Sequence, residues 1–171
     1  MTLEKDGKIS PRELKRTPGV PSYSRLKKGA CAVIECAQTI RCNPCVKACP
    51  SGAIKIKKSI TNLPVLDVNK CSGCGTCIPS CPGLAIFVVD FNYNEKMARM
   101  SIPYEFLPVP QEGNEIAVLG RMGEELCTGK VHGIRKPAKC DHTIVVSFLV
   151  PKKYAMKARN IRTKSQDLGN R

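Results

Sequence analysis

The spacing of apolar residues divides the chain into a region of short, scattered apolar runs and a later region of longer β-prone runs. In the first region, residues 31–93, Ala53 to Lys57 alternates between apolar and polar, and Leu84 to Val89 is continuously apolar. In the later region, residues 94–151, glycine-containing turns separate three β-prone runs: Glu115 to Leu119, Cys127 to His132 and Thr143 to Val150. Runs spaced in this way predict a small β-barrel or sandwich over residues 94–151.

The two ends of the chain are basic. Residues 1–30 carry eight Lys or Arg residues, and three prolines interrupt any helical or strand period, so we interpret this segment as an extended basic arm. Residues 152–171 are interpreted as a basic C-terminal helix and tail, with the helix over Lys152 to Arg162 and with Ala155, Met156 and Ile161 partly buried.

The region of residues 31–93 contains an internal repeat. Six residues recur at a constant separation of 32 positions: Cys42, Cys45, Cys49, Pro50, Ala53 and Ile54 match Cys74, Cys77, Cys81, Pro82, Ala85 and Ile86. Each half reads as a cysteine loop, a short helical turn and a strand. The repeat therefore predicts an α+β domain with a pseudo-twofold axis between two similar halves.

The second half carries a complete C-x2-C-x2-C-x3-C-P run, formed by Cys71, Cys74, Cys77, Cys81 and Pro82. This spacing is that of bacterial-type [4Fe-4S] ligands, because two-residue spacers bring three thiolates from one loop to three corners of a cluster. The fourth cysteine of such a run ligates the other cluster. The run therefore predicts two [4Fe-4S] clusters whose ligands cross between the halves.

The first half departs from this spacing, because the repeat places Thr39 where its first cysteine should stand. Cys36 is the nearest replacement, Cys31 is the second choice, and a site with three thiolates, as in a [3Fe-4S] cluster, stays open. We expect the following ligands: Cys36, Cys42, Cys45 and Cys81 for cluster I, and Cys71, Cys74, Cys77 and Cys49 for cluster II.

Other features of the sequence limit its function. Nine of the 11 cysteines lie between Cys31 and Cys81, and no secretory signal is visible, so a disulfide scaffold is not favoured and a cytoplasmic location is expected. Structural zinc suits separated pairs of cysteines better than three in one loop. The chain shows no nucleotide-binding motif and no nucleophile with a base, so we expect no catalytic site of its own. Cys127, Cys140, His132 and His142 are expected to be structural.

The region from about Val33 to Phe87 resembles bacterial-type two-[4Fe-4S] ferredoxin domains. More broadly, Ile34-Glu35-Cys36, the later β-rich region and Ala155 to Ile161 look like ferredoxin-like accessory subunits of flavin-dependent amine or amino-acid dehydrogenases, acting on proline, hydroxyproline, sarcosine or opine-type substrates. The resemblance implies an electron-transfer subunit in a hetero-oligomer whose partners are FAD- or FMN-containing dehydrogenase subunits.

Two other functions agree with part of the sequence. A free-standing soluble ferredoxin would not require the β-rich region, the basic arm or a formal charge of +14. An iron-sulfur nucleic-acid-binding protein agrees with that charge, but four Phe, four Tyr and no Trp provide few stacking side chains, so nucleic acid is not the expected partner.

Overall fold

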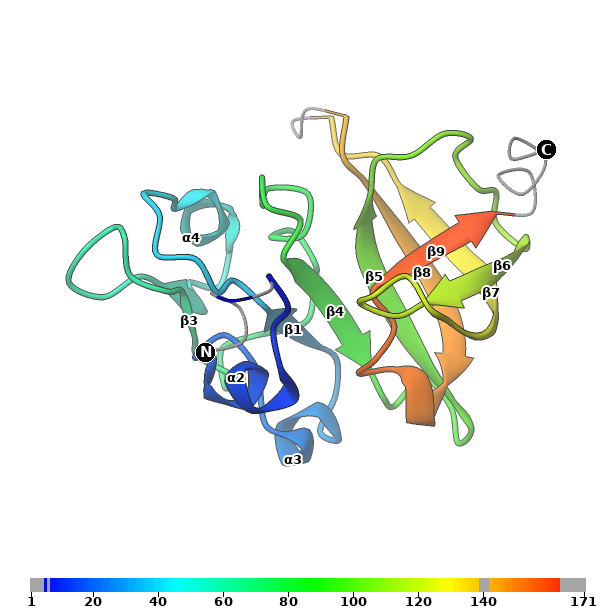
Figure 1. The fold of residues 1–171 in the computed structure, drawn as a ribbon, viewed down its shortest axis with the longest axis horizontal. Helices are drawn as coiled ribbons and strands as arrows, with labels where there is room; N and C mark the ends of the chain where they lie inside the picture. The colour runs from blue at the N-terminus through cyan, green and yellow to red at the C-terminus, as the bar shows by residue number, and fades with distance from the viewer. Residues whose placement is uncertain (1–4, 6, 139–141, 164–171) are drawn as a thin grey trace.

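The computed structural model, which describes residue 5, residues 7–138 and residues 142–163, has two lobes side by side (Figure 1). The cysteine-rich lobe, residues 7–90, contains α2 (Pro11–Arg16), α3 (Tyr23–Leu26), β1 (Cys31–Ile34), α4 (Pro44–Ala48), β2 (Ile54–Lys55), β3 (Val65–Leu66) and β4 (Ile86–Asp90). The β-rich lobe, residues 91–138 and 142–163, contains β5 (Met97–Tyr104), β6 (Glu115–Leu119), β7 (Glu125–Arg135), β8 (Ile144–Pro151), the 3-10 turn η1 (Lys152–Tyr154) and β9 (Asn160–Thr163).

One antiparallel sheet runs through both lobes. Its strand order is β1-β4-β5-β8-β7-β6-β9, and β4 pairs with β1 on one side and with β5 on the other. The boundary expected at residue 93 lies in the turn between β4 and β5. Backbone hydrogen bonds therefore connect the two lobes directly, and the seam between them is a pair of strands.

The cysteine-rich lobe contains two short strand pairs of matching register. Ile34 of β1 pairs with Ile86 of β4, and Ile54 of β2 pairs with Leu66 of β3. Ile54 and Ile86 are 32 positions apart in the sequence, as are Ile34 and Leu66. Each strand pair therefore contains one strand from each half, and all four side chains are buried.

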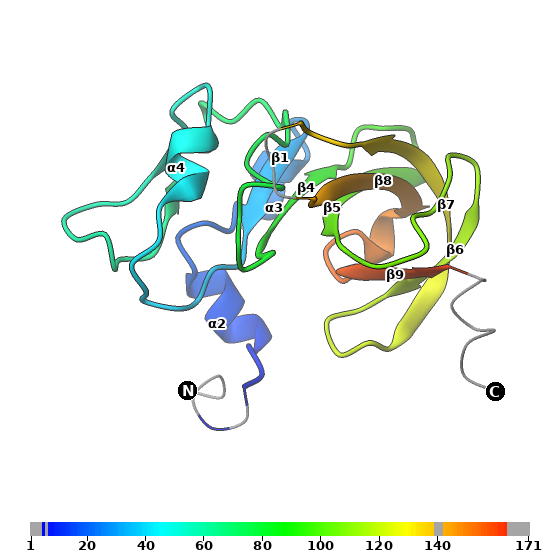
Figure 2. The ribbon, with the colours of Figure 1, turned by 90° about the horizontal axis from the view of Figure 1, so that it is seen from above.

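The β-rich lobe owes its shape to alternating strands that curl around an apolar interior. Every second residue of β5 is buried, and the neighbouring β8 contributes Phe148, which is 0% exposed. The sheet bends so that β9 lies across the interior from β5 (Figures 1 and 2). This lobe agrees with the β-rich region expected over residues 94–151, although its last strand lies beyond that range.

The basic helix expected over Lys152 to Arg162 is wrong. Only the 3-10 turn η1 is helical there, and Asn160–Thr163 forms β9, which pairs with β6. Ile161 and Thr163 are buried and alternate with half-buried neighbours, so pairing with the edge of β6 outweighs the local helical preference. The tail was expected over residues 163–171, but Thr163 is a buried end residue of β9, and residues 164–171 lie outside the described residues.

The described part of the N-terminal segment is not simply extended. Ser10 caps α2 in a capping box with Glu13, so Pro11 begins a helix at a position where proline is well tolerated. Leu26 of α3 is buried, and the amide of Ile34 in β1 donates to the carbonyl of Gly19 at 2.9 Å. This segment therefore packs against β1 as part of the cysteine-rich lobe. Among the described residues, no helix has the length and apolar character needed to cross a membrane.

Candidate metal centre

The first of two four-cysteine cavities lies between the loop after β1 and the start of β4. Its cysteine lining is Cys36, Cys42, Cys45 and Cys81. Cys36 follows the end of β1, Cys45 lies in α4 and is 8% exposed, and Cys81 comes from the second half of the repeat. Ile34 and Ile86 close the apolar side of this cavity.

The second cavity lies on the loop that precedes β4. Its cysteine lining is Cys49, Cys71, Cys74 and Cys77. Cys49 comes from the end of α4 in the first half, and Cys77 is 6% exposed, whereas Cys74 is exposed. The structure therefore brings together the two sets of four cysteines that the sequence predicts, and each set receives one cysteine from the other half.

Backbone amides point at the cysteine sulfurs of both cavities. The amide of Ala53 donates to Cys49 Sγ at 3.2 Å, and the amide of Ala85 donates to Cys81 Sγ at 3.4 Å. These two contacts occupy equivalent positions in the repeat. Hydrogen bonds to cluster sulfur ligands stabilise their negative charge, so the backbone is arranged for thiolates.

The thiols of each cavity hinder one another's ionisation. Burial, and then the charges of Cys81 and Cys42, raise the pKa of Cys45 to about 11. Burial, and then the charges of Cys71 and Cys74, raise the pKa of Cys77 to about 12. A bound metal centre supplies the positive charge that deprotonates such thiols, so each set of cysteines fits a group that contains several metal ions.

Cys31, the second choice for cluster I, lies beside Cys71 of the other set. It is 0% exposed on β1, and its thiol makes a hydrogen bond with Cys71. That hydrogen bond lowers the pKa of Cys71 to about 5, and it raises the pKa of Cys31 above its ordinary value. Cys31 is therefore placed to donate to a ligand of the second site, whereas Cys36 lines the first cavity.

Of the other cysteines and histidines that the structure describes, Cys127 and His132 line neither cysteine cavity, and His142 lines a separate cavity that also contains Cys81. Cys127 lies on β7, and His132 on the same strand packs edge-on against Tyr93, with ring centroids 5.2 Å apart. Cys140 lies outside the described residues. Within residues 7–138 and 142–163, no three His, Cys, Asp or Glu side chains are arranged to hold a single metal ion.

Two arginines from outside the repeat hold the cysteine loop of the second site. Arg25 of α3 donates from Nε to the carbonyl of Val68 at 2.7 Å and from Nη2 to the carbonyl of Cys71 at 2.8 Å. Arg135 of β7 donates from Nη2 to the carbonyl of Gly75 at 2.8 Å. Its Nη1 also donates to the carbonyl of Cys74 at 3.3 Å. We refer to Arg25 and Arg135 as the arginine clamp.

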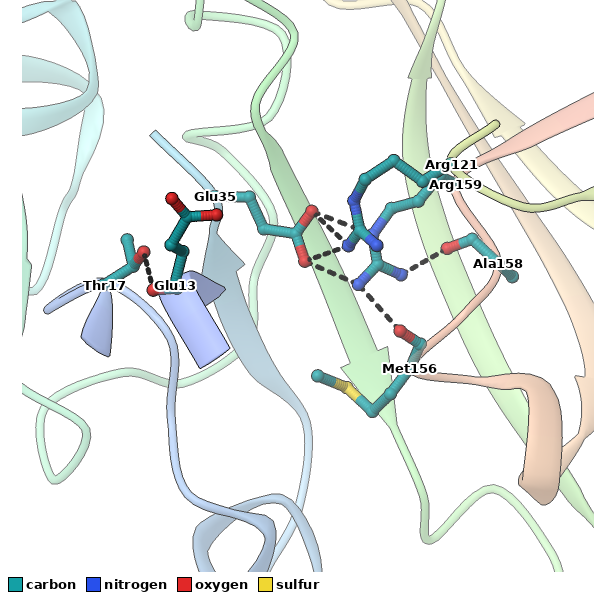
Figure 3. A network of polar contacts seen from close by, with 7 residues as sticks. All are labelled: Glu13, Thr17, Glu35, Arg121, Met156, Ala158 and Arg159. Carbon is teal, nitrogen blue, oxygen red and sulfur yellow. Dashed lines mark hydrogen bonds and ion pairs between the residues drawn. The ribbon is translucent and has the colours of Figure 1, made fainter. Parts of the chain in front are cut away.

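A partly buried ion-pair network lies beside the first site, where Glu35 directly precedes Cys36 (Figure 3). The Glu35 carboxylate accepts from Arg159 Nη2 at 2.6 Å and from Arg121 Nη2 at 2.7 Å. Burial favours the neutral acid, but Arg159 and then Arg121 outweigh it and hold the pKa of Glu35 below its ordinary value. The Arg159 guanidinium also lies over the ring of Phe87, 4.0 Å from its centroid.

Neither the arginine clamp nor this ion-pair network was predicted from the sequence. Arg25 and Arg135 contact backbone carbonyls, which leave no pattern of complementary side chains. Arg121 and Arg159 lie 86 and 124 positions from Glu35, so no local spacing relates them to it. An acidic residue directly before a ligand candidate, in a strongly basic chain, was the signal that could have singled out Glu35.

Crossed sets of four cysteines on a repeated loop and strand define the ferredoxin class of iron-sulfur proteins. In agreement, residues 35–85 match the model of a family described as a 4Fe-4S dicluster domain. The chain therefore contains a dicluster ferredoxin domain, and its cofactors are two [4Fe-4S] clusters, which confirms the cofactors expected from the cysteine spacing.

Three relatives show which proteins contain a similar region. Ferredoxin-type protein NapF of Haemophilus influenzae is 36% identical over 58 residues, which cover 33% of this chain and 33% of that protein. The beta chain of the dissimilatory-type sulfite reductase of Archaeoglobus fulgidus is 35% identical over 72 residues, 42% of this chain and 17% of that protein. One subunit of an ion-translocating oxidoreductase complex of Methanosarcina acetivorans is 40% identical over 47 residues, 28% of this chain and 17% of that protein.

The chain therefore spans a third or less of the length of each of these relatives. No solved structure gives a significant match.

Proposed function

We propose that this protein is the electron-transfer subunit of a multi-subunit oxidoreductase. Its proposed ligands are Cys36, Cys42, Cys45 and Cys81 at the first site and Cys71, Cys74, Cys77 and Cys49 at the second. A [4Fe-4S] cluster bound at either site takes up and releases single electrons. The observation that carries the proposal is the pair of cavities, each lined by four cysteines with one from the opposite half.

The chain's own residues have three tasks in this role. The cysteines would bind the clusters. The amides of Ala53 and Ala85 orient and stabilise the thiolates of Cys49 and Cys81, and buried apolar side chains exclude water on one side of each site. Ile54 and Ile86 are 2% and 0% exposed. Prearranged ligands and apolar packing on one side of each site limit the reorganisation that accompanies a change of charge, which favours electron transfer.

The proposed partner is a dehydrogenase subunit that contains FAD or FMN, in a complex of the amine or amino-acid type. A flavin can take two electrons from a substrate and pass them on singly. Two relatives carry names that describe subunits of oxidoreductases, which supports a subunit role for this chain. The β-rich lobe and the formal charge of +14 provide surface for docking that a freely diffusing carrier does not need.

The ligand assignment is tested by comparing Cys36→Ala with Cys31→Ala, since Cys36 lines the first cavity, whereas Cys31 lies on β1 and contacts Cys71 of the second set. Iron and sulfide are measured after anaerobic purification, together with EPR of the oxidised and reduced protein. We expect about eight iron atoms per chain in the wild type. Cys36→Ala should lose about half of the iron or show a three-iron signal, and Cys31→Ala should keep both clusters.

Full iron content in Cys36→Ala together with loss in Cys31→Ala would reverse the assignment of the first site. The electron-transfer role is tested separately by protein-film voltammetry, in which reversible reduction is expected. Mass spectrometry of an anaerobic native pull-down tests the partner. Recovery of the protein as a monomer, with no associated flavoprotein, would contradict the subunit proposal.

A further inference from the structure

The arginine clamp places two cations at one of the two metal sites. Arg25 comes from α3, before the repeat, and Arg135 comes from β7 in the β-rich lobe, 60 positions after Gly75. Both contact the loop that carries Cys71 and Cys74. Residues on opposite sides of the dicluster domain therefore converge on the same cysteine loop.

The charge of the clamp is not neutralised by its own contacts. Throughout the part of the chain that the structure describes, the acceptors of Arg25 and Arg135 are backbone carbonyls, which carry no net charge. The first site differs, because the carboxylate of Glu35 stands next to Cys36 and offsets one of its two arginines. Among these contacting groups, the clamp brings two positive charges to the second site, whereas the two arginines and Glu35 bring a net charge of one to the first.

Hydrogen-bond donors add to this difference. The amide of Ala32 donates to Cys71 Sγ at 3.4 Å. The hydroxyl of Thr76 lies 3.4 Å from Cys74 Sγ, and the hydroxyl of Ser51 lies 3.6 Å from Cys49 Sγ. Each donor favours a more negative sulfur, and reduction of a bound cluster adds one negative charge.

We propose that Arg25 and Arg135 raise the reduction potential at the second site above that at the first, so that an electron on this chain resides at the second site. Cations and hydrogen bonds stabilise the reduced state because it carries one more negative charge than the oxidised state. In the internal transfer the first site loses one electron and the second gains it, with no proton or atom moved. This inference rests on the proposed cysteine ligands and the proposed electron-transfer function.

The test is an EPR-monitored redox titration of the anaerobically purified holo-protein and of Arg25→Gln and Arg135→Gln. The wild type should show two midpoint potentials. In each variant the higher potential should fall, with the equilibrium constant for reduction at that site decreasing roughly tenfold, because one positive charge beside the cysteine loop is removed. A tenfold change corresponds to about 59 mV for a one-electron couple.

Two further variants separate charge from folding. Arg162→Gln removes the same charge from β9, where the arginine pairs with Glu125 on the neighbouring surface, and should leave both potentials unchanged. Arg135→Lys retains the charge and should retain most of the potential. Iron and sulfide are measured in every variant, and the exposed Arg135 provides a test even if Arg25→Gln fails to fold.

The proposal is overturned if only the lower potential moves, if Arg135→Gln shifts neither, or if both wild-type sites share one potential. Two reversible wild-type couples that do not respond to Arg135→Gln would reject the clamp and leave the proposed function intact. A wild type without reversible reduction at either site would instead reject the proposed function.

Discussion

The two metal sites share a cysteine arrangement but differ in what holds them from outside. The loop of the first site is attached to the β-rich lobe through Glu35, whose carboxylate binds two arginines. The loop of the second site is held through its backbone carbonyls by the arginine clamp. The comparison shows that the repeat provides two similar sets of ligands, while residues outside the repeat give each copy its own electrostatic surroundings.

Removal of iron and sulfide is expected to have the largest effect, and to affect the two lobes to different extents. The cysteine region relies on two-residue strands β2 and β3, whereas β5 and β8 pair over eight residues with a buried interior. Without metal, amides from Cys36 to Cys81 should lose most of their protection, and those of β5 and β8 should keep theirs. Hydrogen exchange with mass spectrometry measures this protection. An equal loss of amide protection in both lobes would contradict the prediction.

The ion-pair network of the first site should give the next largest effect. Glu35→Ala leaves Arg159, with 10% of its side chain exposed, without its carboxylate, and we expect a loss of about 3–5 kcal/mol in the free energy of unfolding. Glu125→Ala is the matched control, because Glu125 pairs with Arg162 on the exposed surface. That change should cost only about 0–1 kcal/mol.

Anaerobic denaturation followed by far-UV circular dichroism measures both variants. Equal losses in the two variants would mean that burial does not set the strength of the network.

The loop of the second site should respond to a smaller change, Gly73→Ala. Gly73 has a φ of +70°, and an added Cβ would stand 2.6 Å from the Cβ of Ala30 and 2.7 Å from its carbonyl carbon. The left-handed backbone and the overlap together should cost about 2–3 kcal/mol and lower the cluster content of this site. The reference is Gly113→Ala, at a φ of +85° with open space around the new methyl group.

Gly113→Ala should cost about 1 kcal/mol and leave iron and sulfide unchanged. The same denaturation and iron assays compare the two glycine variants. A Gly73→Ala protein with unchanged iron content and stability would show that the loop adapts without loss.

Local patterns in the sequence were sufficient where neighbouring residues determine the structure. For example, β6 spans the expected Glu115 to Leu119. The two sets of cysteines expected from the spacing also line one cavity each, with Cys36 at the first, and their role as ligands stays a prediction. In these cases the alternation of apolar residues or the spacing of ligands extends over a few residues, so the pattern can be recognised without knowledge of the fold.

Prediction from the sequence failed where contacts between residues far apart in the chain determine the local structure. Residues after Lys152 have helix-forming composition, yet Asn160–Thr163 becomes a strand because β6 offers an unpaired edge. Cys31 was considered for the first site, but its place on β1 brings it to Cys71. The arginine clamp binds carbonyls far away in the sequence, and only the folded backbone defines where those carbonyls point.

The position of β4 in the middle of a shared sheet has a consequence for any attempt to isolate the dicluster domain. β4 forms hydrogen bonds with β1 and with β5. Cutting the chain after residue 93 would strip one side of β4 and leave the edge of a strand that contains Phe87, Val88 and Val89 open to other chains. The truncated protein would be expected to self-associate along this edge, because β5 of the β-rich lobe covers it in the full chain.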